Sequence, residues 1–241
     1  MKLLDTKADN GNTKVRNTAL SAGREYRFAQ LSLHPTAELC PASKAAGCMD
    51  LCLKSSGLAQ VYDSINNARM RKTQFFLNNT ELFLAQLNKE LSNFAKLCDR
   101  QNVMGIVRLN VLSDIMWEEY AIPQQHPTLQ FYDYTKRASR FDKPMPDNYK
   151  LMFSYSGAPS YRNQVQRYLD SGTDAPMTVV FRKAPFPSTF MGKRVIDGDK
   201  SDWFNVNQKD CIIGLKFKNV KKSPDNMPFV VDNTDLIAMG G

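Results

Sequence analysis

The chain has 241 residues, of which 42% are hydrophobic and 23% are charged. This is a globular composition, and it is long enough to bury one substantial core. No apolar run approaches the roughly 18 residues that span a bilayer, and the N-terminus shows no apolar stretch of a secretory signal. We therefore expect no membrane partner and a cytoplasmic location, where clustered cysteines are more often metal ligands than disulfides.

The formal net charge of +8 is unevenly distributed along the chain. Residues 181–222 carry ten Lys and Arg against four Asp and no Glu. A basic region of this kind can bind nucleic acid or a small anionic ligand, and it can equally be a solvated surface. No P-loop, zinc-finger pairing or aromatic-interleaved RNA-binding signature accompanies it.

The chain reads as a single domain, with a core predicted at 24–222. Residues 1–23 are polar and are expected to be loose or strapped over the surface, and 223–241 form a C-terminal segment. A strand is predicted at 24–35, where Pro35 closes it. A cysteine-containing loop follows, and a helical pattern runs from about Asp63 to Cys98, with apolar residues at three- and four-residue spacing.

Strand and helix patterns then alternate. Strands are predicted at 103–112, 128–135, 149–156, 175–183, 193–199 and 211–218, and helices at 114–122 and 160–172. Strands that alternate with helices at this spacing predict βα units and a parallel sheet.

The two faces of the predicted strands differ. One face carries apolar residues that should meet the helices: Val107, Leu109, Leu129, Phe131, Leu151, Phe153, Val179 and Phe181. The other carries polar residues near the strand ends: Arg108, Asn110, Tyr132, Tyr134, Ser154, Ser156 and Arg182. A flat doubly wound sheet would be apolar on both faces. The pattern therefore favours an α/β fold with a partial or irregular (β/α) barrel of mostly parallel strands and a polar mouth.

Three of the five cysteines, Cys40, Cys48 and Cys52, fall within thirteen residues, directly after the first predicted strand. A structural zinc would need a fourth ligand such as His34. Three thiolates from one loop of small residues can instead hold three corners of a four-iron cluster and leave one iron open. Unligated thiols are the third possibility. Cys98 and Cys211 lie on apolar faces and are expected in the core.

Five stretches carry a resemblance to a known family: CPASKAAGCMDLC, NNARMRKTQFF, VRLNVLSDIMWEEY, FYDYTKR and VIDGDKSD followed by CIIGLKFK. Together, over about Asn12 to Lys218, they resemble a phage-encoded family of small iron–sulfur proteins that looks like a reduced relative of the radical-SAM enzymes. The resemblance implies a [4Fe–4S] cluster on Cys40, Cys48 and Cys52, formed in the cytoplasm of a bacterial host. It leaves both SAM-dependent chemistry and electron transfer open.

Two departures from true radical-SAM enzymes accompany this resemblance. The spacing C-x7-C-x3-C is longer than their C-x3-C-x2-C, and NVLSD stands where they carry a Gly-Gly-Glu-like run that contacts the SAM amino group. If S-adenosylmethionine binds, Asn110, Ser113 and Asp114 are the expected contacts.

An anionic ligand at the mouth would meet polar residues at the strand ends. The predicted substrate-binding residues are Arg108, Tyr134, Lys136, Ser154, Ser156 and Arg182, with the cations pairing to carboxylate or phosphate. Equally, each cation could pair with a carboxylate of the chain. The alternative function, from another class, is a zinc-stabilised nucleic-acid-binding protein that uses the basic region up to Lys222.

Overall fold

A parallel sheet forms the centre of the protein. The computed structural model describes residues 1–6, 26–49, 63–218 and 227–233. Within these ranges nine strands form the sheet: β1 (Tyr26–Gln30), β2 (Met104–Arg108), β3 (Leu129–Thr135), β4 (Tyr149–Ser154), β5 (Met177–Phe181), β6 (Thr189–Phe190), β7 (Lys193–Asp197), β8 (Ile212–Lys216) and β9 (Val230–Val231). The predicted strands are thus confirmed.

The strand order is β1-β2-β3-β4-β5-β8-β7-β6, and β9 pairs with β5. Every pair is parallel except β6 with β7. Each of the first five strands lies next to its predecessor, so the chain winds in one direction, whereas a doubly wound sheet reverses. The sheet is not closed, which confirms the partial, irregular barrel.

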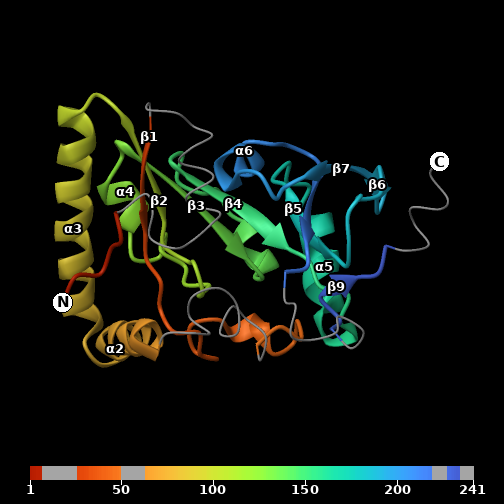
Figure 1. Cartoon of the computed structure of the whole chain (residues 1–241), viewed down its shortest axis with the longest axis horizontal. Coiled ribbons are helices and arrows are strands. Elements are labelled where there is room, and N and C mark those ends of the chain that lie inside the picture. Colours follow the sequence, from red (N-terminus) through yellow and green to blue (C-terminus); the bar gives the residue numbers. More distant parts are fainter. Residues whose placement is uncertain (7–25, 50–62, 219–226, 234–241) are drawn as a thin grey trace.

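The long helical prediction resolves into two helices, α2 (Asp63–Asn78) and α3 (Thr80–Arg100), with a break at Asn79. Figure 1 shows α3 upright alongside the sheet and α2 lying crosswise at the lower end of α3. Helix α5 (Arg162–Asp170) confirms the later prediction. The helix predicted at 114–122 is wrong, because this segment forms turns and α4 (Ile122–Gln125) begins at its end.

The predicted apolar face is confirmed. All eight of its residues are buried, at 4% exposure or less. Those of β2 and β3, with Leu151, pack in one cluster with the apolar stripe of α3: Phe83, Leu87, Leu91, Phe94 and Cys98. Those of β5, with Phe153, pack against α5. Burial of this face against two helices makes it the main core of the protein.

The opposite face is less polar than predicted. The short helix α6 (Asp202–Val206) covers it, as Figure 1 shows above β4. Phe28, Ile106, Tyr132 and Met152 pack there with Cys211 and other apolar residues in a second, smaller core. The strand face is therefore filled by the chain itself, and the polar side chains that reach beyond it lie at the strand ends.

Both chain ends extend the predicted core. Leu3 and Leu4 are buried, and their backbone N–H groups donate to the carboxylate of Glu90 on α3. Of the segment predicted to be loose or strapped over the surface, residues 1–6 are therefore docked, and 7–23 lie outside the described residues. Strand β9, in the C-terminal segment, joins the sheet at β5.

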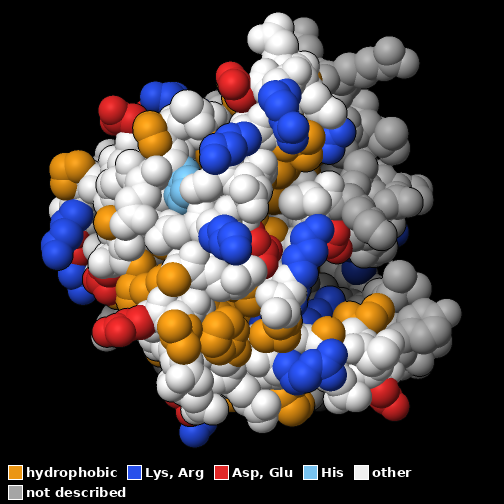
Figure 2. Space-filling model, turned by 90° about the vertical axis from the view of Figure 1, so that its left-hand side faces the viewer, with side chains coloured by type: hydrophobic (Ala, Val, Ile, Leu, Met, Phe, Trp, Pro, Cys, Tyr) orange, Lys and Arg blue, Asp and Glu red, His pale blue; other side chains and the backbone are white. Residues whose placement is uncertain are grey.

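Figure 2 shows the face of the molecule on the α2 and α3 side. Hydrophobic side chains gather on its lower part. The exposed large hydrophobic residues of α2, of the first turn of α3 and of the segment before α4 are Met70, Leu77, Leu82 and Tyr120. Lys and Arg side chains are scattered over this face rather than joined in a stripe. Among the described helices, none is both long enough and apolar enough to cross a membrane.

Candidate functional site

The cysteine loop folds into a compact coil after β1. Cys40 precedes a single 3-10 turn, η2 (Pro41–Ser43), and its carbonyl accepts a hydrogen bond from Ser43 Oγ at 2.6 Å. The backbone N–H of Cys48 donates a hydrogen bond to the carbonyl of Ser43 at 3.1 Å, which turns the chain back on itself. Gly47 makes this return possible with a left-handed φ of +69°, a conformation that glycine adopts without steric cost. Cys52 lies outside the described residues.

Residues that follow β2 and β4 hold this loop. The backbone N–H of Asp114, after β2, donates to the carbonyl of Leu39 at 2.7 Å. After β4, Ser156 Oγ donates to the carbonyl of Ala46 at 2.8 Å and Ser160 Oγ donates to that of Ala45 at 2.7 Å. Carboxyl ends of parallel strands meet at one edge of a sheet, so the loop is docked on the edge where open α/β sheets bind ligands.

Cys40 and Cys48 are both half-buried. Burial raises the pKa of the Cys48 thiol, whereas the ammonium of Lys136 lowers it and the carboxylate of Asp114 raises it further. The same two cysteines and Asp114 add to burial in raising the pKa of Tyr161, so these groups lie near one another. A metal that bound these sulfurs would supply the positive charge that thiolates need in this partly buried place.

Lys136 bridges the loop and the sheet. Its backbone N–H donates to Asp114 Oδ2 at 2.8 Å, and its carbonyl accepts from the hydroxyl of Tyr161 at 2.7 Å. Its ammonium donates to Ser154 Oγ at 3.1 Å and lies 5.5 Å from the centre of the Tyr161 ring. Of the predicted ligand-binding residues, Lys136, Ser154 and Ser156 are thus brought to the cysteine loop.

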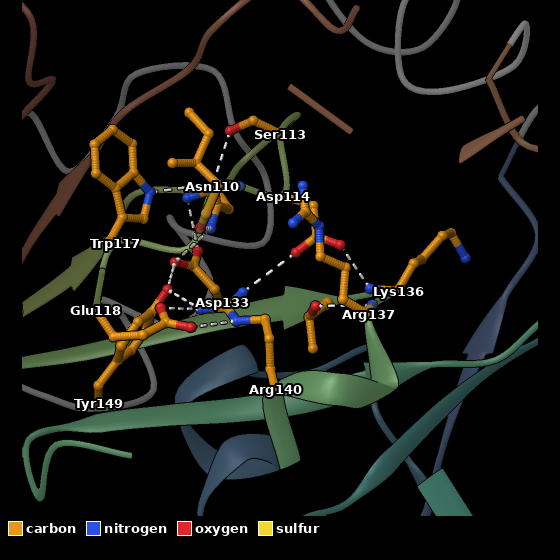
Figure 3. Close-up of polar contacts among 12 residues, drawn as sticks. Asn110, Ser113, Asp114, Trp117, Glu118, Asp133, Lys136, Arg137, Arg140 and Tyr149 are labelled. Carbon is orange, nitrogen blue, oxygen red and sulfur yellow. Dashed lines mark hydrogen bonds and ion pairs between the residues drawn. The ribbon is translucent and has the colours of Figure 1, made fainter. Parts of the chain in front are cut away.

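A buried polar network lies beside the loop (Figure 3). Asn110 Oδ1 accepts from the Ser113 hydroxyl, the Ile115 N–H and the Trp117 indole, at 2.8, 3.0 and 3.1 Å. These bonds hold residues 113–117 in turns, which explains why the predicted helix is absent there. The amide of Asn110 donates to Asp133, so this side chain is fully engaged within the protein.

Arg140 closes the other side of the network. Its guanidinium contacts Asp114 at 3.2 Å and Glu118 at 2.7 Å, and it donates to the Tyr149 hydroxyl. Tyr149 in turn donates to Asp133 at 2.8 Å. The Asp114 carboxylate therefore binds both the guanidinium of Arg140 and the backbone N–H of Lys136. Because the backbone of Asp114 is also bonded to Leu39, these contacts fix both residues relative to the cysteine loop.

The remaining predicted binding residues are paired elsewhere. Arg108 contacts Asp202 of α6 at 2.9 Å, and the Tyr134 hydroxyl donates to the same carboxylate at 2.7 Å. Arg182 pairs with Asp232 at 2.6 Å. The structure therefore supports the alternative in which Arg108 and Arg182 pair with carboxylates of the chain itself.

The described residues supply only part of a ligand set for a thiolate-bound metal. Among them, no group of three or more His, Cys, Asp or Glu side chains is placed to hold a metal ion. Two thiols are in place, and the third predicted ligand, Cys52, lies outside the described residues. His34 sits at the start of the loop, and its backbone N–H donates to Thr73. Cys98 and Cys211 are buried in the two opposite cores, as predicted.

Sequence reasoning missed several residues that build this site. Arg140 stands in a segment rich in Lys, Arg and Pro that looks exposed, and Tyr161 looks like an ordinary helix residue. Asp133 occupies an alternating position on the apolar face of β3, between Phe131 and Thr135. A carboxylate on an apolar strand face was the one signal of a buried network that the sequence offered.

Comparison with known proteins places the chain in a family. No curated protein and no solved structure matches it. One family model, described as gene product 88, matches residues 2–225, and this description names no activity or ligand. Because the match covers nearly the whole chain, the protein belongs to the gene product 88 family, a family of the phage type.

Proposed function

We propose that the protein is an iron–sulfur protein whose [4Fe–4S] cluster is held by Cys40, Cys48 and Cys52, with one iron left open. The observation that carries this proposal is the docked loop, which brings the half-buried Cys40 and Cys48 to the carboxyl edge of a parallel sheet. When bound, such a cluster transfers electrons or offers its open iron to a ligand.

The chain's own residues prepare this site. Ser156 and Ser160 hold the loop backbone between the first two cysteines, and Asp114 holds the residue before Cys40. The carbonyls of Leu39, Ala45 and Ala46 thereby accept hydrogen bonds from residues at the carboxyl edge of the sheet. A loop fixed in this way loses less conformational freedom when a cluster binds.

The sheet supports the resemblance to radical-SAM proteins without specifying a reaction. The strands follow one another in sequence order, and the cysteine loop follows the first of them. However, Asn110, Ser113 and Asp114 make bonds within the protein, which favours a positioning role for them over contact with S-adenosylmethionine. Lys136 and Ser154 are then the best candidates for binding an anionic ligand beside the open iron.

The alternative of a zinc-stabilised nucleic-acid-binding protein is less well supported. Four of the ten Lys and Arg of the basic region form ion pairs with Asp side chains: Arg182 with Asp232, Lys193 with Asp210, Lys209 with Asp174 and Lys218 with Asp199. Paired cations add little to the electrostatic attraction of a phosphate backbone.

Anaerobic purification followed by metal and sulfide analysis tests the proposal. We expect coloured protein with about four irons and four sulfides per chain. Electron paramagnetic resonance of the reduced protein, with and without S-adenosylmethionine, then asks whether the open iron takes that ligand. Colourless protein that holds stoichiometric zinc would reject the cluster and favour the alternative.

A further inference from the structure

Helix α6 lies on the face of the sheet opposite α3 and α5. Strands β1 to β5 follow one another in one direction across the sheet, whereas the step from β7 to β8 runs back toward β5. Connections between parallel strands are right-handed, so the reversed step places α6 on the opposite face. There Trp203 and Val206 of α6 pack into the smaller core. The reversal also brings Asp202, the first residue of α6, to the carboxyl ends of β2 and β3.

Asp202 holds two side chains together at these strand ends. Its carboxylate is fully buried, and Oδ2 accepts from Arg108 Nη1 at 2.9 Å while Oδ1 accepts from the Tyr134 hydroxyl at 2.7 Å. The Arg108 guanidinium also lies 4.7 Å from the centre of the Tyr134 ring. Side chains of two neighbouring strands therefore converge on one oxyanion, which the chain supplies from a position 94 residues beyond Arg108.

Asp202 leaves hydrogen-bond donors of this place unused. Arg108 Nε and the Tyr132 hydroxyl are buried and have no hydrogen-bond partner among the residues that the structure describes. The guanidinium carbon lies 5.9 Å from the centre of the Tyr132 ring, so the two groups are neighbours. Each oxygen of Asp202 already accepts a bond, and a buried donor without an acceptor is unfavourable. The place therefore suits an anion with more acceptor oxygens than a carboxylate.

We propose that Arg108, Tyr132 and Tyr134 form a binding site for the phosphate group of a small ligand, and that Asp202 of α6 closes this site as an internal competitor. A phosphate group offers three acceptor oxygens, and a guanidinium binds it through two N–H groups at once. One guanidinium does not neutralise both a carboxylate and a phosphate in a buried place, so the ligand displaces Asp202. The site goes beyond the proposed function and needs no metal.

Helix α6 is suited to this displacement. It has five residues, so its departure breaks little backbone hydrogen bonding. The side-chain oxygen of Asn205, on α6 itself, is buried without a donor in the described part of the chain, and Phe204 is 54% exposed. Polar groups are thus left unpaired both on α6 and on the strands beneath it, which lowers the free energy needed to open the site.

Equilibrium dialysis with labelled inorganic phosphate tests the site in the full chain. Asp202→Asn removes the charge of the internal competitor, so we expect it to bind phosphate about tenfold more tightly than wild type. Tyr132→Phe, added to Asp202→Asn, should weaken that binding about tenfold. It should leave stability in urea unchanged, because the deleted hydroxyl has no partner among the described residues. Tyr120→Phe in the same background changes an exposed tyrosine and is the matched control; it should bind phosphate like Asp202→Asn.

The displacement of α6 has its own readout. Trp203 packs against Tyr132, with ring centres 6.3 Å apart, so added phosphate should shift the tryptophan emission of Asp202→Asn to longer wavelengths. Bound phosphate without this shift overturns the displacement.

The remaining outcomes decide the site. Asp202→Asn that binds phosphate no better than wild type overturns the proposal, and so does binding that Tyr132→Phe leaves unchanged, which marks an adventitious ion only. Tighter binding of acetate than of phosphate overturns the choice of ligand. If Asp202→Asn does not fold, thermal unfolding decides: phosphate should raise the melting temperature of wild type more than that of Tyr132→Phe, and equal shifts overturn the site. None of these results depends on iron content, so the site and the cluster stand or fall separately.

Discussion

Replacing Asp133 by Asn should change how the stability of the protein depends on pH. The Asp133 carboxylate is 1% exposed and lies on the apolar face of β3. Burial raises its pKa to about 7, although the charges of Arg108 and Arg140 and the hydrogen bonds from Tyr149 and Asn110 act in the opposite direction. The folded protein therefore holds a proton that the unfolded chain releases near its ordinary pKa of 3.8.

The sign and size of the effect follow from proton linkage. Between about pH 4 and pH 7 Asp133 binds more protons in the folded state than in the unfolded chain, so its contribution to the free energy of unfolding falls as pH rises. Each tenfold difference in proton affinity corresponds to about 1.4 kcal/mol. The difference for Asp133 is about a thousandfold, so its contribution to the loss is on the order of 4 kcal/mol.

Urea unfolding at a series of pH values, followed by the fluorescence of buried Trp117, measures this contribution. Asp133→Asn should show a markedly flatter decline in the free energy of unfolding than wild type between pH 4 and pH 7. Exposed Asp147 offers a matched control, and Asp147→Asn should follow wild type. Parallel curves for wild type and Asp133→Asn would refute the raised pKa of the buried Asp133 carboxyl group.

Two pairs of substitutions probe how the cysteine loop is held. Gly47→Ala should lower the free energy of unfolding more than Gly172→Ala. Both glycines have left-handed φ values, which cost an alanine about 1 kcal/mol, but an added Cβ at Gly47 lies 2.4 Å from Pro228 Cγ, whereas an added Cβ at Gly172 has nothing within 4 Å. Equal losses of stability in urea unfolding would reject the close contact at Gly47. Ser156→Ala should lower the free energy of unfolding by about 1–3 kcal/mol, since Ser156 is buried and hydrogen-bonded to the loop. Ser160 is exposed, so Ser160→Ala should change this free energy by less than about 0.5 kcal/mol. The loop cysteines should react faster with a thiol reagent in Ser156→Ala than in wild type, and an unchanged rate would contradict the docking role of Ser156.

Local patterns were sufficient to predict the main core. The alternation of Val107 with Leu109 and of Leu151 with Phe153 specified which strand face is buried, because side chains in a strand alternate with a period of two. The alternation of strands and helices specified parallel pairing. Both signals come from neighbouring residues and need no knowledge of distant partners.

The second core and the buried network could not be predicted in this way. Arg108 meets Asp202 across 94 positions of sequence, and a five-residue helix has too short a pattern to show that it covers a sheet. Asn110 looks like an ordinary polar residue at the end of a strand, and its contacts depend on where Trp117 and Asp133 arrive in space. Long-range pairing of polar side chains leaves no periodic trace.

Iron and acid-labile sulfide, measured per chain in anaerobically purified variants, test the central claim most directly. The triple variant Cys40→Ser, Cys48→Ser, Cys52→Ser should lose both, and the double variant Cys98→Ser, Cys211→Ser serves as the control that keeps the loop thiols. We expect about four irons in wild type, the same per folded chain in the control, and none in the triple variant. A triple variant with the iron and sulfide content of wild type would contradict the cluster.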